Sequence, residues 1–226
     1  MKIALKILLT VLPGFTLSRV YAQTDSSIRM VIATRINNCV YRAILDTNNN
    51  IFIERDAERA VQKIKNSELE GEGIAAIEFT DVNADGYKDL VITYNSNVPD
   101  RRDLFLFDKQ RDGFHHIKDY PDYPGPVKLA QTHLYYSYHR SGCADSDWDS
   151  DLFEIVNYKI VKLGNISGQG CGRDEPLGIF IYKIAGHSEK LVKRLPLSET
   201  GRYKNGKWGF IAYYWKKNYK NFSGKS

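Results

Sequence analysis

The chain lacks several features that would assign it to a familiar class. After residue 22 it has no apolar run near the roughly 20 residues that span a bilayer, so no membrane span is expected in that part. The residue directly after the export cut predicted at residue 22 is Gln23 and not cysteine, which argues against a lipid anchor there. Two methionines stand against fifteen tyrosines and ten phenylalanines, a balance that favours β-sheet over helical packing.

Residues 1–22 have the order of a secretory signal. Lys2 and Lys6 precede an apolar run that ends at Pro13, and small residues precede a cut after Ala22. We therefore expect a mature protein of residues 23–226 that is periplasmic or secreted. Removing Lys2, Lys6 and Arg19 would lower the formal net charge from +5 to +2, so the basic isoelectric point does not indicate nucleic-acid binding.

Turn-forming residues divide the mature chain into short apolar or aromatic runs. The first two, 28–34 and 39–45, flank Asn37-Asn38, which is typical of a β-hairpin. Residues 51–65 fit either a helix or two strands around a polar turn, and we favour the strands. The other predicted strands are 74–80, 90–94, 104–107, 134–138, 152–156, 179–184, 191–195 and 208–215.

These runs predict a mostly β fold: a single antiparallel sandwich or partial-propeller-like domain over residues 23–226. Residues 119–126 contain three prolines and are expected to be an internal seam. Residues 200–208 are expected to form a basic aromatic hairpin. The chain beyond Tyr219 is expected to be frayed.

An acidic segment between two predicted strands carries the strongest motif. From Asp81, side chains with oxygen atoms recur at positions 1, 3, 5 and 9, and Gly86 takes position 6. This spacing lets a tight loop direct alternate oxygens to one centre, which suits calcium. The alternative is a polar turn without a metal, because Asp, Asn and Gly are ordinary turn formers. The predicted calcium ligands are Asp81, Asn83, Asp85, Tyr87 through its backbone carbonyl, and Asp89.

The loop is not an EF-hand, which would need an acidic residue where Ile92 stands and helices on both sides. The order of a strand, D-x-N-x-D-G-x-x-D-L and a second strand resembles the calcium loops of FG-GAP and VCBS repeats. The motif occurs once here, which predicts one blade-like hairpin within another β fold and not a complete propeller.

The three cysteines are expected to form one bridge, since an exported protein meets an oxidising compartment. Three pairings are possible, and we favour Cys143–Cys171 because both residues lie in Gly- and Asp-rich loops. Cys39 lies in an apolar alternation and is expected to be a buried, inert thiol.

Residues 133–153 concentrate histidine, aromatic and acidic side chains. In an extended strand four alternate aspartates would share one face, where they would either hold a second cation or be solvated. A catalytic interpretation would pair His139 with Asp145 or Asp147 and use Ser137 or Ser141 as the nucleophile. No recognisable nucleophile elbow or zinc-protease helix accompanies these residues, so we expect no enzymatic activity. The four residues are Asp145, Asp147, Asp149 and Asp151.

A second histidine motif, His115-His116, is expected to lie on the surface at a strand end, because the sequence places no third metal ligand beside it.

The export signal, the single acidic loop and the Y-H-R-x-G-C segment at 138–143 together resemble a family of small periplasmic proteins. Its best understood members are immunity proteins that inhibit peptidoglycan hydrolases delivered by bacterial-killing type IV secretion systems; their fold is similar to that of periplasmic lysozyme inhibitors. The resemblance covers roughly residues 74–172 and implies a peptidoglycan hydrolase as the partner. Outside the acidic loop, no inhibitory residue can be matched.

The residues themselves leave two other classes open: a module that binds cell-wall glycan or peptidoglycan through exposed aromatic rings, and a purely structural envelope protein. The segments expected to present a binding surface are 120–126, 142–151 and 200–208. A flat row of exposed rings would favour glycan binding, and one protruding loop would favour inhibition. The rings that discriminate are Tyr120, Tyr123, Tyr203 and Trp208.

Overall fold

The computed structural model describes residues 26–56, 60–71, 73–172 and 176–223. The predicted signal peptide and its cleavage after Ala22 lie outside these residues. Within them, no helix has the length and apolar character needed to cross a membrane.

Residue contacts divide the chain into two compact units between Asn66 and Ser67. The division does not fall at 119–126, where the prolines indicated a seam. The expected single domain stays a prediction, because compactness alone does not show whether either unit folds by itself. Both units consist of antiparallel sheets, which confirms the predicted mostly β fold.

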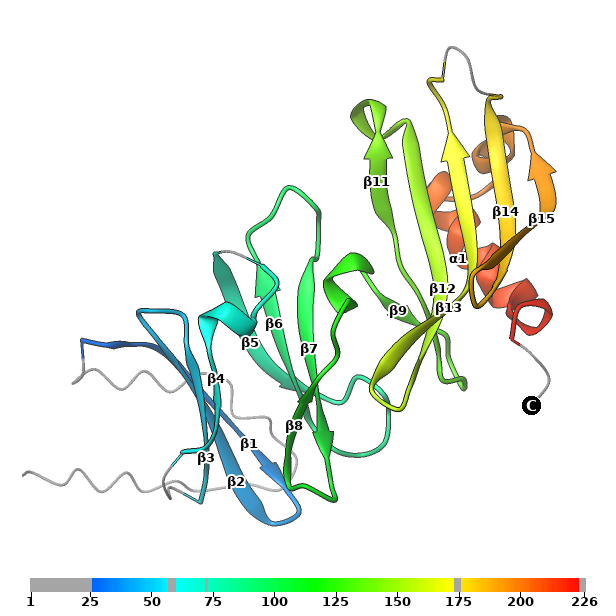
Figure 1. Cartoon of the computed structure of the whole chain (residues 1–226). Coiled ribbons are helices and arrows are strands. Elements are labelled where there is room, and N and C mark those ends of the chain that lie inside the picture. Colours follow the sequence, from blue (N-terminus) through cyan, green and yellow to red (C-terminus); the bar gives the residue numbers. More distant parts are fainter. Residues whose placement is uncertain (1–25, 57–59, 72, 173–175, 224–226) are drawn as a thin grey trace, which may run out of the picture. The chain divides into compact units, whose positions relative to one another are not determined.

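The first unit is a four-stranded meander in the order β1-β2-β3-β4, drawn in blue and cyan in Figure 1. Asn37 and Asn38 form the turn between β1 and β2 with φ of 50° and 67°, as a two-residue hairpin turn of type I′ requires. Two strands occupy residues 51–65, as favoured. The strands are β1 (Ile28–Ile36), β2 (Cys39–Asp46), β3 (Ile51–Arg55) and β4 (Ala60–Ile64), and η1 (Asn66–Glu68) follows them.

The second unit begins with a four-stranded sheet in the order β5-β6-β7-β8. Strands β5 and β6 pair from Ile74 opposite Tyr94 to Thr80 opposite Asp89, so residues 81–88 form the loop of a hairpin, as predicted. The bounds are β5 (Ile74–Thr80), β6 (Asp89–Tyr94), β7 (Arg102–Asp108) and β8 (Gly113–His116).

A seven-stranded sheet follows, in the order β15-β14-β13-β12-β10-β9, and β11 also pairs with β12. The long strand β12 therefore pairs with β10, β11 and β13. The strands are β9 (Val127–Lys128), β10 (Leu134–Tyr136), β11 (His139–Gly142), β12 (Asp147–Val156), β13 (Lys159–Gln169), β14 (Gly178–Ala185) and β15 (Ser188–Leu195). The short 3₁₀ helices are η2 (Tyr120–Asp122), η3 (Cys143–Asp145), η4 (Leu197–Arg202) and η5 (Tyr219–Asn221).

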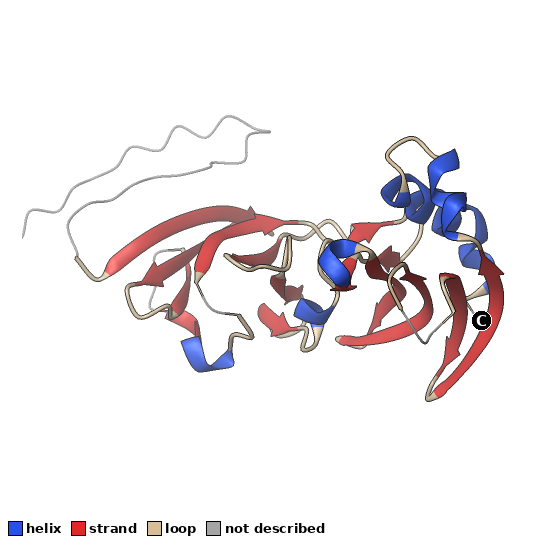
Figure 2. Ribbon diagram, turned by 90° about the horizontal axis from the view of Figure 1, so that it is seen from above, coloured by secondary structure: helices blue, strands red, loops and turns tan. Residues whose placement is uncertain are grey.

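Helix α1 (Lys207–Asn218) packs against this sheet, and Figure 2 shows it in blue beside the strands. Trp215 is buried in the interface, and its Nε1 donates a hydrogen bond to the Ser150 hydroxyl at 2.9 Å. The strand predicted at 208–215 is therefore wrong. The apolar residues Phe210, Ile211, Tyr214 and Trp215 recur at helical spacing and bury one side of a helix.

Two further predictions for the C-terminal region are wrong for the same reason. Residues 200–208 are the end of η4, a turn and the start of α1, not a hairpin. Beyond Tyr219, Phe222 is buried with its ring centroid 5.1 Å from that of Trp215. The apolar contact holds this end against the core, so the expected fraying does not begin at Tyr219.

Candidate functional site

The predicted calcium ligands lie in the β5–β6 loop, where backbone amides fix their side chains. Asp81 accepts hydrogen bonds from the amides of Asp85 at 3.2 Å and Gly86 at 3.0 Å. The side-chain oxygen of Asn83 accepts from the Asp85 amide at 3.1 Å. Asp85 in turn accepts from the Tyr87 amide at 2.8 Å. Gly86 has φ of 92°, a conformation that favours glycine, so the sharp turn expected at this position is present.

Asp89 anchors the loop from the first position of β6. Its fully buried carboxylate accepts hydrogen bonds from the amides of Val82 and Phe107, both at 2.9 Å. The pKa of Asp89 is raised to about 6. Burial is the main cause, the negative charges of Asp85 and Asp81 add to it, and the two hydrogen bonds act to lower the pKa. The three carboxylates therefore repel one another, and a bound cation would relieve that repulsion.

Strand β9 supplies a positive charge beside the loop, and β10 supplies a tyrosine. The Lys128 ammonium group donates to the backbone carbonyl of Asn83 at 2.5 Å and lies 5.1 Å from the centroid of the Tyr135 ring. Burial lowers the pKa of Lys128, and the carboxylates of the loop oppose that effect. The Tyr135 hydroxyl donates to the carbonyl of Val82 at 3.1 Å, so both side chains hold the loop to the larger sheet.

The donor set of this loop fits calcium. Its carboxylate, amide and carbonyl groups are all oxygen donors, the ligands that calcium prefers. In the described chain, Asp81, Asp85 and Asp89 are not among the groups of three whose ligand atoms all lie within 4.8 Å of one another. Calcium tolerates this, because it takes about six to eight oxygens at roughly 2.3–2.6 Å, and ligands on opposite sides are about 5 Å apart.

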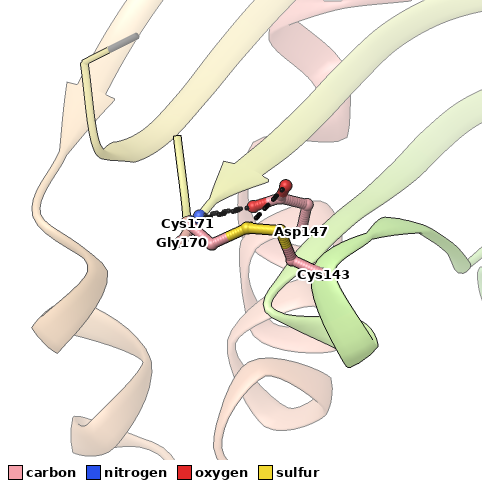
Figure 3. Close-up of a disulfide and its surroundings, with 4 residues drawn as sticks. All are labelled: Cys143, Asp147, Gly170 and Cys171. Atoms are coloured by element: carbon pink, nitrogen blue, oxygen red, sulfur yellow. Dashed lines mark hydrogen bonds between the residues drawn. A yellow bond between two sulfur atoms is a disulfide. The ribbon is translucent and has the colours of Figure 1, made fainter. Parts of the chain in front are cut away.

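The predicted disulfide is present and braces one end of the seven-stranded sheet. Cys143 in η3 is bonded to Cys171, which follows β13 (Figure 3). Asp147 strengthens the same joint, because its carboxylate accepts hydrogen bonds from the amides of Gly170 at 2.7 Å and Cys171 at 3.2 Å. Cys39, expected to be buried, is half-buried and lies outside the disulfide.

A partly exposed aromatic and cationic cluster adjoins the disulfide. The Lys207 ammonium group lies 4.4 Å from the Trp208 ring centroid and pairs with the Asp145 carboxylate at 2.8 Å. The rings of Tyr138 and Trp208 are 4.4 Å apart, and the Tyr138 hydroxyl donates to Asp145. Arg140 lies 3.7 Å from Asp145 and is largely exposed. We call these five residues the tip patch: Tyr138, Arg140, Asp145, Lys207 and Trp208.

The four alternate aspartates do not gather around one centre. Asp145 belongs to the tip patch, and Asp147 binds backbone amides. Asp149 lies 3.4 Å from the Asn165 amide group, whereas Asp151 is buried beside Lys162 at 2.6 Å. Asp149 and Asp151 share Asn165, but Asp145 and Asp147 have separate partners, so the structure does not gather the four carboxylates into the second cation site that the sequence left open.

The catalytic pairing considered for His139 is wrong. Its Nε2 lies 3.8 Å from Asp151 and not beside Asp145 or Asp147. Ser137 is fully buried, and its hydroxyl accepts a hydrogen bond from the Asp151 amide at 3.2 Å. The two groups belong to the structure of the sheet.

The sequence did not predict one further cluster of side chains that could bind a metal ion. Glu70, Asp103 and His116 place one ligand atom each within 4.8 Å of one another. His116 was expected on the surface, but its side chain is only 17% exposed. Asp103 and His116 meet through the pairing of β7 with β8, and Glu70 reaches them through the hydrogen bond of its amide to Asp103. No local motif could have revealed this cluster.

The rings proposed to discriminate glycan from protein binding do not form an exposed row. Tyr120 is 3% exposed, whereas Trp208 is 47% exposed. Tyr123 and Tyr203 are half-buried.

No family model and no curated protein matches the chain. Among solved structures, one described as a Xanthomonas type IV secretion system related protein is similar, with a TM-score of 0.50. The two chains are 13% identical, and the match covers 76% of this chain and 97% of that one. At this identity the similarity concerns the fold. The description of that protein names a type IV secretion system and no FG-GAP or VCBS repeat.

Proposed function

We propose that the chain is an exported, calcium-binding protein without catalytic activity that binds and inhibits a peptidoglycan hydrolase associated with type IV secretion. The observation that carries the proposal is the tip patch, a cluster beside a disulfide in which Trp208 and Arg140 are exposed and the other residues are half-buried. The secretion context is supported by the similar fold of the Xanthomonas protein. The hydrolase is the partner that the sequence resemblance implies.

The composition of the tip patch suits a protein interface. Trp, Tyr and Arg are enriched among residues that contribute most to protein–protein affinity. Lys207 bridges the Trp208 ring and the Asp145 carboxylate, and Tyr138 is fixed by the same carboxylate. These contacts hold the rings in place before binding, which lowers the entropic cost of forming a complex.

The acidic loop has a structural part in this proposal. A calcium ion held by Asp81, Asn83, Asp85, the Tyr87 carbonyl and Asp89 would neutralise the repelling carboxylates. The loop is tied to β9 and β10 through Lys128 and Tyr135, so calcium would stabilise the sheet that carries the tip patch.

Glycan binding is the second candidate, favoured by the exposure of Trp208. A single exposed ring provides a smaller platform for sugars than the row that glycan binding was expected to need. The burial of Tyr120 therefore favours a protein partner.

The test measures binding of residues 23–226 to a purified hydrolase that is encoded with a type IV secretion system, by biolayer interferometry in calcium buffer. Trp208→Ala should weaken binding about 30-fold, the effect of losing a hot-spot residue of about 2 kcal/mol. Tyr213→Ala is the matched control, because Tyr213 is equally exposed at 48% on the same helix but lies outside the tip patch.

Equal binding by the wild type and Trp208→Ala would contradict the role of the tip patch. Cosedimentation with insoluble peptidoglycan, combined with no binding to the hydrolase, would replace the proposal with the glycan-binding alternative.

A further inference from the structure

Asp103 is a fully buried carboxylate in the middle of the smaller sheet of the second unit. One of its oxygens, Oδ2, accepts two hydrogen bonds: one from the Glu70 amide at 3.0 Å and one from the Tyr94 hydroxyl. Its second oxygen faces Nε2 of His116 at 3.1 Å. Two donors thus orient the carboxylate and leave the other oxygen directed at an imidazole.

A neighbouring aromatic ring holds the His116 imidazole in place. Its ring stacks on Phe105 with centroids 4.4 Å apart and an interplanar angle of 13°. Phe105 and His116 are direct partners in the pairing of β7 with β8, and Asp103 is two residues from Phe105 on the same face. Strand register therefore positions the imidazole against the carboxylate.

Glu70 brings a second carboxylate to this pair. Its amide is bonded to Asp103, and the next residue, Gly71, lies so close to the Tyr94 ring that an added Cβ would be 2.4 Å from it. The glycine lets the chain pass directly over the buried site. One carboxylate oxygen of Glu70 completes a group of three ligand atoms that all lie within 4.8 Å of one another.

We propose that Glu70, Asp103 and His116 form a binding site for a zinc ion. The ligand set of one imidazole and two carboxylates is of a kind that zinc uses. Zinc bonds of about 2.0–2.2 Å in a tetrahedron place neighbouring ligand atoms roughly 3.3–3.6 Å apart. The 3.1 Å between His116 and Asp103 needs only a few tenths of an ångström of expansion to accept the ion.

Charge and surroundings support the same assignment. Two carboxylates and a neutral imidazole balance the charge of a divalent ion. Asp103 accepts hydrogen bonds from the Tyr94 hydroxyl and the Glu70 amide. In metal sites, such contacts behind a ligand orient it toward the ion. Glu70 is exposed, so the fourth position would face water and the ion could enter from that side.

The site uses none of the residues of the acidic loop or the tip patch, so zinc binding can be tested independently of the proposed function. Its nitrogen ligand also separates it from the all-oxygen calcium loop, since imidazole suits zinc better than calcium. A bound ion would fasten the segment before β5 to β7 and β8.

The test titrates chelator-treated residues 23–226 with zinc chloride by calorimetry, in excess calcium so that the acidic loop is occupied. Wild type should bind one zinc ion. Glu70→Gln should weaken the zinc affinity by roughly tenfold or more, because loss of a direct ligand should cost at least as much as loss of a residue that only orients a ligand. Glu68→Gln, an exposed neighbour outside the cluster, is the control and should bind as wild type does.

His116→Gln provides a second variant, and cobalt(II) provides a spectroscopic readout. Cobalt should give the visible absorption of a four-coordinate site in wild type and lose it in His116→Gln. Thermal unfolding in chelator verifies that Glu70→Gln folds normally. Absence of zinc binding by wild type, or equal affinities of wild type and Glu70→Gln, would overturn the proposal.

Discussion

Removal of the Cys143–Cys171 disulfide should destabilise the second unit by about 3.5 kcal/mol. The two cysteines are separated by 28 positions, and closing a loop of that length removes chain entropy from the unfolded state by about this amount at 25 °C. The double variant Cys143→Ser/Cys171→Ser keeps the hydrogen bonds of Asp147 to the amides of Gly170 and Cys171. The fold should therefore persist.

Urea unfolding followed by tryptophan fluorescence measures this loss, because all three tryptophans lie in the second unit. The melting temperature should fall by roughly 7–14 °C, at about 2–4 °C per kcal/mol for a chain of this size. Cys39→Ser is the control that removes a thiol and keeps the bridge. A loss below about 1 kcal/mol in the double variant would show that the disulfide does not stabilise the second unit through the entropy of the unfolded chain.

Two further perturbations test the electrostatics of the second unit. Lys128→Met removes a positive charge beside the acidic loop, so the variant should be less stable in chelator and gain more in melting temperature from calcium than wild type; an unchanged gain would contradict the placement of calcium there. The carboxylate of Asp151 raises the pKa of His139 against the effect of burial, and its stabilising contribution should be complete below about pH 6.5 and lost as the pH rises through the raised pKa. Burial acts to raise the pKa of Asp151, but His139 and Lys162 hold it below its ordinary value, so its contribution should be present above about pH 4 and lost on acidification below that. Urea unfolding between pH 3 and 8 should show a smaller loss above pH 6.5 in His139→Gln than in wild type, and equal losses would argue against the pairing.

Features encoded by neighbouring residues could be predicted from the sequence. Asn37-Asn38 specified a hairpin because both residues tolerate the positive φ that the turn requires. The spacing from Asp81 to Asp89 specified a loop whose oxygens are fixed by its own amides. The bridge between Cys143 and Cys171 followed from the loop composition around each cysteine.

Features that depend on tertiary packing could not be predicted. Residues 208–215 are rich in the aromatic side chains that favour strands, but they form a helix because Phe210 and Trp215 fill one side of a sheet core. The cluster of Glu70, Asp103 and His116 depends on the register of β7 and β8 and on the path of the chain over Tyr94. Neither the register nor that path has a local signal in the sequence.

Inhibition can be measured as the rate at which a type IV secretion-associated hydrolase clears a peptidoglycan suspension while residues 23–226 are added in calcium buffer. Clearing should stop near one equivalent of wild-type protein, and Trp208→Ala should require a large excess. An undiminished rate in excess wild-type protein would contradict the proposed inhibition.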